Sequence, residues 1–295
     1  MYDTKKKQHK RKGAPLLILV IVLLIAGVIA IFSPVLTVEM ELRQDTEDYE
    51  RLGEQFRVVT TEESPQDGTP EAAGPAAMPE TAMASPFAAS NPFKTGRTGV
   101  DIAACKAEND DFVAWIQIPG TTVDYPVVLS NDTQHYLEHT FSGKKSYLGT
   151  LFSLAKTDYQ TPGRNIAIYG HHIRSNGQVM FSPLISYKNQ SFYEGHKTIY
   201  LDSLYHSDTY IVCAVINMRS GDWDQSATSF ASDDDFLAYV QRAKSQSLYD
   251  TCVEVTAKDQ ILTLITCDRS YIPQYGRLVV MAVRQQPADH PLSHR

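Results

Sequence analysis

The chain has 295 residues, of which 43% are hydrophobic, so it can bury one sizeable core and leave residues over. Its formal net charge of −7, with no basic stripe after residue 12, argues against a nucleic-acid partner. No internal repeat is visible, which argues against a repeat array.

The N-terminus combines a basic cluster with an apolar segment. Ala14 to Phe32 carries no charged or polar side chain, and at about 1.5 Å per residue it can cross the roughly 30 Å hydrocarbon layer of a bilayer. Lys and Arg stay on the cytoplasmic side, so we expect a cytoplasmic tail over 1–13 and an extracytoplasmic chain from residue 33. The basic cluster consists of Lys5, Lys6, Lys7, Lys10, Arg11 and Lys12.

A cleaved signal peptide is the alternative interpretation of this segment. The apolar region of a signal peptide usually spans about 7–15 residues and ends in small residues resembling A-x-A. The segment here is longer and ends Ile31-Phe32-Ser33-Pro34-Val35, with no such site nearby. The pattern therefore favours an uncleaved, single-pass anchor over 14–32.

The region 33–98 separates this anchor from the folded domain. Val38 to Arg57 is charged, and we expect a short juxtamembrane helix there. From about Thr60 to Thr98 the chain is rich in Pro, Ala, Glu, Ser, Thr and Gly without periodicity, a composition that cannot bury enough apolar surface to offset its ordering entropy. We therefore expect a disordered tether before a domain over 99–286 and a short tail over 287–295.

The domain over 99–286 is predicted to be mainly β, because short runs rich in β-branched residues outnumber helical segments. Many short strands with few helices favour a closed or nearly closed antiparallel barrel. We expect helices over 101–109, with Asp101 as cap, around 180–186, and over 233–245, where three aspartates suit a helix N-terminus. The expected strands are 112–118, 121–129, 147–154, 165–169, 197–202, 209–218, 252–256, 260–266 and 277–283.

The chain has four cysteines, and their pattern does not indicate a metal site. None of the spacings among Cys105, Cys213, Cys252 and Cys267 matches a zinc motif, and nothing in the sequence calls for a metal or another cofactor. Disulfides are allowed outside the membrane, so a Cys213–Cys252 bridge stays open as an alternative. The simpler interpretation places Cys213 in a core strand.

Cys267 ends the β-rich run QILTLIT and precedes the polar run Asp268-Arg269-Ser270-Tyr271. We expect this thiol at a strand end, where a rigid sheet meets an open loop. The chain resumes as RLVVMAV from Arg277, and adjacent antiparallel strands lie about 5 Å apart. A thiol beside a fixed cation becomes a nucleophile, although an arbitrary cysteine is more often an inert buried residue.

A thiolate nucleophile needs a partner that delivers a proton to the leaving amine, and His is the usual choice. Of the nine histidines, His171 follows the apolar strand Asn165 to Tyr169 through Gly170, which puts its imidazole at a strand end. A surface histidine or a His171–His172 metal pair are the alternatives. Neighbours on an extended chain point to opposite sides, which disfavours a shared metal and makes His172 an orienting or solvent-facing residue.

These motifs together resemble the sortase family. They are Tyr169-Gly170-His171-His172, the element TLxTC that ends at Cys267, and Arg277 ten residues later, in that order. Four further features resemble the class B branch of the family in particular. They are FVAWI from Phe112, DYPVV from Asp124, Tyr136-Leu137, and the helix-containing insertion between Met218 and Cys252. The resemblance covers about residues 99–286, and the membrane anchor fits it as well.

The resemblance implies a cysteine transpeptidase on a closed eight-stranded β-barrel preceded by one transmembrane helix. Cys267 would attack the Thr carbonyl of a C-terminal sorting signal, His171 would act as general acid and then base, and Arg277 would hold the oxyanion. Leu137, Thr266 and Asp268 would contact substrate, Leu137 from the groove wall. The partners implied are secreted proteins with a sorting signal and an amine on a peptidoglycan precursor or a pilin.

The sequence departs from the class B pattern at several positions. Ile265 stands where Ser is common, Arg269 where some relatives carry an acidic residue, and Ser153-Leu154 replaces an acidic strand end. These departures concern the sorting motif more than the chemistry. Trp223 is either a groove aromatic or a packing residue. A peptidase that uses water as acceptor, and a binding module with an inert Cys267, are the alternative functions.

Overall fold

The computed structural model describes residues 14–58, 96–175 and 177–285. Its contacts divide the chain into two compact units, Met1–Glu47 and Asp48–Arg295. The basic tail expected over 1–13, most of the tether and the C-terminal tail lie outside the described residues. The second unit begins at Asp48, well before residue 99, so it includes residues of the predicted juxtamembrane segment.

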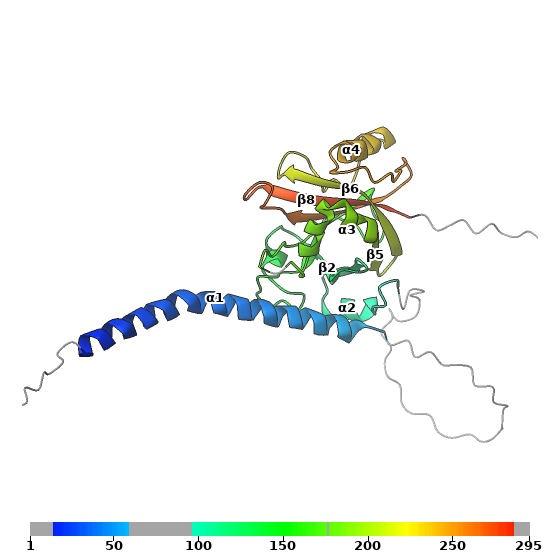
Figure 1. Ribbon diagram of the computed structural model, residues 1–295. Helices are drawn as coiled ribbons and strands as arrows, with labels where there is room; N and C mark the ends of the chain where they lie inside the picture. Colours follow the sequence, from blue (N-terminus) through cyan, green and yellow to red (C-terminus); the bar gives the residue numbers. More distant parts are fainter. Residues whose placement is uncertain (1–13, 59–95, 176, 286–295) are drawn as a thin grey trace, which may run out of the picture. The chain divides into compact units, whose positions relative to one another are not determined.

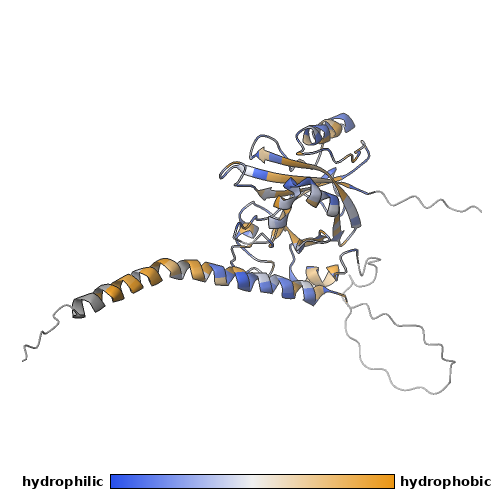
Figure 2. Cartoon of the chain, viewed as in Figure 1, coloured by the Kyte–Doolittle hydropathy of each residue, from blue (hydrophilic) through white to orange (hydrophobic). Residues whose placement is uncertain are grey.

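The first unit consists of the N-terminal part of helix α1 (Ala14–Phe56). Helix α1 is one continuous element of 43 residues, where the sequence predicts an apolar anchor and a separate juxtamembrane helix. In the part of α1 that Figure 2 colours by hydropathy, hydrophobic residues come first and mostly hydrophilic residues follow. By length and composition alone, it is the one described helix that could cross a membrane.

The second unit is built on a closed eight-stranded barrel (Figure 1). The strand order around the barrel is β1-β2-β3-β4-β7-β8-β6-β5, and β1 pairs with β5 to close it. The strands are β1 (Phe112–Gln117), β2 (Asp124–Ser130), β3 (Leu151–Leu154), β4 (Asn165–Tyr169), β5 (Thr198–Ser203), β6 (Ser207–Arg219), β7 (Ile261–Cys267) and β8 (Gly276–Arg284).

Short helices occupy the connections between the strands. They are α2 (Ile102–Glu108), η1 (His135–Leu137), η2 (Ser182–Lys188), α3 (Gln190–Gly195) and α4 (Asp233–Ser245). The predicted cap of the first is confirmed, because the Asp101 side chain accepts a hydrogen bond from the Ala104 amide. The segment expected to be helical around 180–186 forms the 3₁₀ helix η2 and continues into α3.

Two expectations about the sheet are wrong. The barrel is mixed rather than antiparallel, because β2 pairs with β3 and β4 pairs with β7 in parallel. Residues 252–256 form no strand, since Cys252 has a φ of 56°, which interrupts an extended chain. Val255 within this segment is nevertheless buried in an apolar cluster with Phe236 and Val240 of α4, so its β-branched side chain serves packing rather than sheet pairing.

Helix α4 packs on the outer face of the barrel next to β6 (Figure 1). Its Phe236 and Val240 are almost fully buried, in a cluster with Ile265 of β7 and Val279 of β8. Burying each such side chain contributes about 1.5–3 kcal/mol relative to leaving it exposed. Side chains alternate along a strand, so residues 261, 263, 265 and 267 of β7 point to the same side of the sheet. The Cys267 side chain therefore emerges on the face that carries α4.

The last turns of α1 belong to the second unit and pack against the barrel. The Tyr49 hydroxyl donates to the carbonyl of Gly149 at 2.6 Å and accepts from the amide of Phe141 at 3.1 Å. Phe56 makes an edge-to-face contact with buried Trp115, with ring centroids 6.5 Å apart.

Candidate active site

Cys267 and Arg277 are cross-strand partners. Strands β7 and β8 are antiparallel, and their register places Cys267 directly opposite Arg277. In such a pair both side chains point to the same face, and their Cβ atoms lie about 4.5–5.5 Å apart. The guanidinium is half-buried and donates to the neighbouring carbonyl of Gly276 at 3.0 Å. The register therefore brings a cation beside the thiol, as the sequence predicts.

His171 reaches the same strand end from the other side of β7. Strand β4 runs parallel to β7 with Tyr169 opposite Ile265. Beyond β4, the Gly170 amide donates to the carbonyl of Ile265 at 3.1 Å, and Thr266 Oγ1 donates to the carbonyl of Gly170 at 2.8 Å. The backbone at His171 therefore continues alongside Cys267. Cys267 of β7, Arg277 of β8 and His171, which follows β4, therefore lie at one end of the barrel.

Backbone carbonyls fix the two neighbouring histidine rings. His172 Nδ1 donates to the carbonyl of Cys267 at 2.9 Å, which supports its predicted orienting role over a solvent-facing one. His171 Nε2 donates to the carbonyl of Leu137 at 2.9 Å. Because a carbonyl can only accept, the Nε2 atom of His171 carries a proton, and Nδ1 is the nitrogen that can take one up.

The environment of His171 favours its neutral form. Burial lowers the pKa of His171 below its ordinary value, and the positive charge of Arg269 acts in the same direction. The hydrogen bond to Leu137 opposes both effects without reversing them. Near neutral pH this imidazole is therefore a base rather than an acid.

The three residues predicted to contact substrate lie in different surroundings. Leu137 ends η1, is half-buried, and holds His171 through its backbone. The Thr266 side chain is buried and bonded to Gly170, and the Asp268 side chain is fully buried. The polar groups of Thr266 and Asp268 are thus occupied within the protein, which favours a part in positioning the site; their contact with substrate stays a prediction.

Asp268 anchors the β7–β8 loop, residues 268–275, to η2. Its Oδ2 lies 2.6 Å from Lys188 Nζ, and its Oδ1 accepts from the amide of Ser270 at 3.0 Å. Burial works to raise the pKa of Asp268, but the hydrogen bonds and charge of Lys188 and the bonds from Ser270 hold it below its ordinary value. The loop also closes tightly at Gly276, where an added Cβ would lie 2.0 Å from the carbonyl oxygen of Asp268.

We expect Lys188→Ala to lower the free energy of unfolding at pH 7 by about 2 kcal/mol, because it leaves a buried carboxylate without its cation. A depressed Asp pKa stabilises the fold above the unfolded pKa of about 3.9, and this contribution is lost as pH falls through the lower folded pKa. The variant should therefore differ from wild type at pH 7 and much less at pH 2. Urea unfolding at both pH values measures this, and an equal difference at both would contradict the pairing.

The four thiols are free, so the alternative Cys213–Cys252 bridge does not form. Cys105 and Cys213 are buried, Cys252 is exposed and Cys267 is half-buried. Burial raises the pKa of Cys105, and it raises that of Cys213 to about 12, so neither is a ready nucleophile. Among the described residues no group of three or more His, Cys, Asp or Glu could hold a metal ion.

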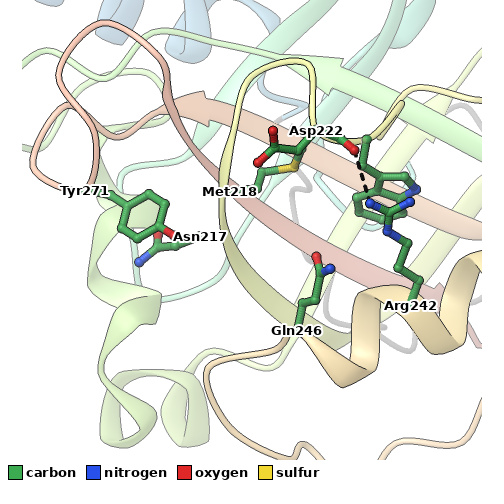
Figure 3. Close-up of a pocket in the computed structure, with 7 residues that line it drawn as sticks. Asn217, Met218, Asp222, Arg242, Gln246 and Tyr271 are labelled. Atoms are coloured by element: carbon green, nitrogen blue, oxygen red, sulfur yellow. Dashed lines mark hydrogen bonds between the residues drawn. The ribbon is translucent and has the colours of Figure 1, made fainter.

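Some site residues were not found from the sequence. Lys188 is 80 positions from Asp268, and no local pattern marks a lysine that pairs across such a distance. Trp223 both packs and lines a cavity (Figure 3): its ring lies 4.5 Å from that of Tyr239, and its side chain is partly buried. The two interpretations of this tryptophan are therefore compatible.

The sequence of this chain is similar to those of known proteins. The Sortase domain family model matches residues 116–285. The chain is 33% identical over 174 residues to sortase B of Staphylococcus aureus, covering 59% of this chain and 70% of that protein. It is 33% identical over 172 residues to sortase B of Listeria monocytogenes, covering 58% and 69% respectively.

Solved structures of class B sortases are also similar to this chain. A structure of a S. aureus sortase B–substrate complex superposes with a TM-score of 0.66 at 26% identity, covering 84% of this chain and 99% of that one. Clostridium perfringens sortase B gives a TM-score of 0.58 at 30% identity, covering 62% of this chain and 99% of that one. The residues that the family model matches, 116–285, run from the end of β1 through β8.

Proposed function

The chain belongs to the sortase family of cysteine transpeptidases, with class B relatives, and from this premise we propose that it attaches secreted proteins to an amine acceptor. It cleaves a C-terminal sorting signal after Thr and transfers the new carboxyl end to an amine of a peptidoglycan precursor or a pilin. The single observation that carries this proposal is the register in which Cys267 faces Arg277 while His171 follows the adjacent strand.

Cys267 is the nucleophile of the proposed reaction. Its sulfur attacks the Thr carbonyl of the sorting signal, and the tetrahedral intermediate collapses to a thioester as the C–N bond breaks. Arg277 donates hydrogen bonds to the oxyanion that forms on the attacked carbonyl. The cross-strand pairing of Cys267 with Arg277 supports these two roles.

His171 moves the protons in both halves of the reaction. As the thiol attacks, the neutral imidazole takes up the proton of the thiol and then gives it to the departing amine. In the second half it takes a proton from the incoming amine, whose nitrogen attacks the thioester and releases the Cys267 thiolate. The lowered pKa of His171 supports the role, because it keeps the imidazole free to accept a proton.

The sorting signal enters on the β4 side of Cys267 in this proposal. Leu137 forms the groove wall there, and its carbonyl also orients the His171 ring. Thr266 and Asp268 shape the floor and the loop beside the thiol rather than reading the signal directly. Ile265 is buried under α4, so it offers no polar contact to a substrate.

Membrane attachment completes the proposal. The apolar part of α1 anchors the chain once in the cell membrane, with the basic N-terminus in the cytoplasm and the barrel outside. The length and apolar composition of α1 support this arrangement. An enzyme held in this way meets secreted proteins and cell-wall precursors at the outer face of the membrane.

Incubating the full-length protein in detergent micelles with a panel of quenched sorting-signal peptides tests the function. Each peptide is offered with and without triglycine as the amine acceptor, and mass spectrometry identifies the products. We expect at least one peptide to be cleaved after Thr and joined through a new amide bond to the amine. Cleavage in which the amine never appears in the product would indicate a peptidase, and no cleavage of any peptide would reject the proposed function.

A further inference from the structure

Tyr49, in the last turns of helix α1, is built into the barrel unit. Its side chain is buried, and its hydroxyl reaches the 138–150 loop, which joins η1 to β3. The hydroxyl donates to the carbonyl of Gly149 at 2.6 Å and accepts from the amide of Phe141 at 3.1 Å. One side chain of α1 therefore holds two separate points of this loop.

The end of α1 is fixed as well. The carbonyl of Phe56 accepts from the amide of Asp101 at 2.8 Å, and the amide of Val58 donates to the carbonyl of Gly99 at 3.0 Å. The end of the helix is thus paired with the residues that lead into α2. Only about two turns separate Phe56 from Tyr49 within one continuous helix, so this pairing also fixes the position of Tyr49.

The 138–150 loop lies directly against η1. The amide of Thr150 donates to the carbonyl of Tyr136 at 2.7 Å. The backbone of Gly149 packs so closely that an added Cβ would lie 2.9 Å from the carbonyl oxygen of Leu137. That carbonyl is the one that accepts from His171 Nε2. A displacement of Gly149 would therefore move the group that sets the orientation of the imidazole.

The ring of Tyr49 reaches the histidine segment by a second route. It packs edge to face on the ring of Tyr125 in β2, with centroids 5.6 Å apart. The Tyr125 hydroxyl accepts from the amide of Met180 at 3.3 Å, and Met180 forms a β-bridge with His172. The contacts of Tyr49 thus converge from two directions on the turn that follows β4.

We propose that Tyr49 is a positioning residue for the transfer reaction: its hydroxyl keeps the 138–150 loop against η1, and so keeps the Leu137 carbonyl where it orients the His171 imidazole. The inference rests on the proposed function, in which His171 moves the protons. Helix α1 then has a second role besides membrane attachment, because its last turns set the geometry of the general acid and base.

The test compares two Tyr→Phe variants of the full-length protein in detergent micelles. Tyr49→Phe removes the hydroxyl and keeps the aromatic ring, so the fold is preserved. Tyr210→Phe is the matched control, because Tyr210 is also buried and its hydroxyl donates to Gln260 at 2.9 Å. Tyr210 pairs with Arg284, at the end of β8 away from Arg277. Each variant loses one buried hydroxyl, so urea unfolding should show a similar loss of stability in both.

The first readout is the rate of transfer from the sorting peptide that the wild type cleaves to triglycine. We expect Tyr49→Phe to lower kcat about tenfold, equivalent to about 1.4 kcal/mol, because a displaced imidazole delivers its proton less effectively. Tyr210→Phe should keep the wild-type kcat.

The second readout does not depend on turnover. It is an NMR titration of isotope-labelled histidines, in which the His171→Ala variant identifies the resonance of His171. The hydrogen bond to Leu137 raises the pKa of His171, whereas burial and the charge of Arg269 lower it. Weakening that bond in Tyr49→Phe should therefore move the titration of His171 to lower pH, and Tyr210→Phe should leave it in place.

A wild-type kcat in Tyr49→Phe would overturn the inference, and so would an equal loss of kcat in Tyr210→Phe. A lower kcat without a shift in the His171 titration would also overturn it, because the defect would then lie elsewhere. A wild type that cleaves no peptide would instead reject the proposed function itself, while the titration would still show whether Tyr49 positions the His171 ring.

Discussion

Replacing Cys267 with alanine is expected to abolish peptide cleavage and transfer, reducing the rate to that of the uncatalysed background. The other thiols cannot substitute for it. Cys105 and Cys213 are buried with raised pKa values. Cys252 follows α4 in the chain and lines a cavity whose lining includes neither His171 nor Arg277. Cleavage of the quenched peptide, and the mass of the thioacyl adduct, measure the loss directly.

Cys252→Ser is the matched control for this prediction, because it removes the most exposed thiol outside the site. It should cleave and transfer at the wild-type rate. Brief alkylation of the native wild type should label Cys252 and Cys267 and spare the two buried thiols. A Cys267→Ala protein that still cleaves the sorting peptide, or a wild type that loses Cys267 to alkylation without losing activity, would leave a binding module with an inert cysteine as the better interpretation.

Local patterns in the sequence were sufficient for much of the fold. Strand β4 and helix α4 have the predicted bounds, because each begins and ends at a sharp change in residue type. The Ser232 side chain caps α4 by accepting from the amide of Asp235, and the three aspartates follow in the first turn. The closed eight-stranded barrel that the family resemblance implied is confirmed.

The remaining features depend on contacts between distant residues. The parallel pairing of β4 with β7 joins residue 165 to residue 261, and nothing in either strand distinguishes a parallel from an antiparallel partner. At the end of α1, Tyr49 and Phe56 contact Gly149 and Trp115 of the barrel unit, and these contacts support the continuation of the helix to Phe56. Periodicity within the segment could not reveal that burial, because the surface it covers comes from elsewhere in the chain.

The candidate site divides in the same way. Cys267 and Arg277 are neighbours because a short loop joins two adjacent strands, which the sequence indicates directly. The strand–Gly–His pattern led to His171, but the carbonyl of Leu137 that fixes its ring comes from η1, 34 residues earlier. The cavity that Trp223 lines draws on β6, α4 and the β7–β8 loop, so only the three-dimensional structure brings its residues together.

Removing the guanidinium of Arg277 is expected to cost about 10²–10³ in kcat, the usual effect of losing one oxyanion donor. In Arg277→Ala, kcat and kcat/KM should fall together, because the lost interaction forms only in the transition state. Arg277→Lys should recover part of the rate, since an ammonium keeps the charge but not the planar pair of donors. Arg284→Ala is the matched control, because Arg284 lies at the other end of β8 and pairs with Asp208. Steady-state kinetics with the sorting peptide and triglycine distinguish these variants. A wild-type kcat in Arg277→Ala, or an equal loss in Arg284→Ala, would rule out Arg277 as the oxyanion donor.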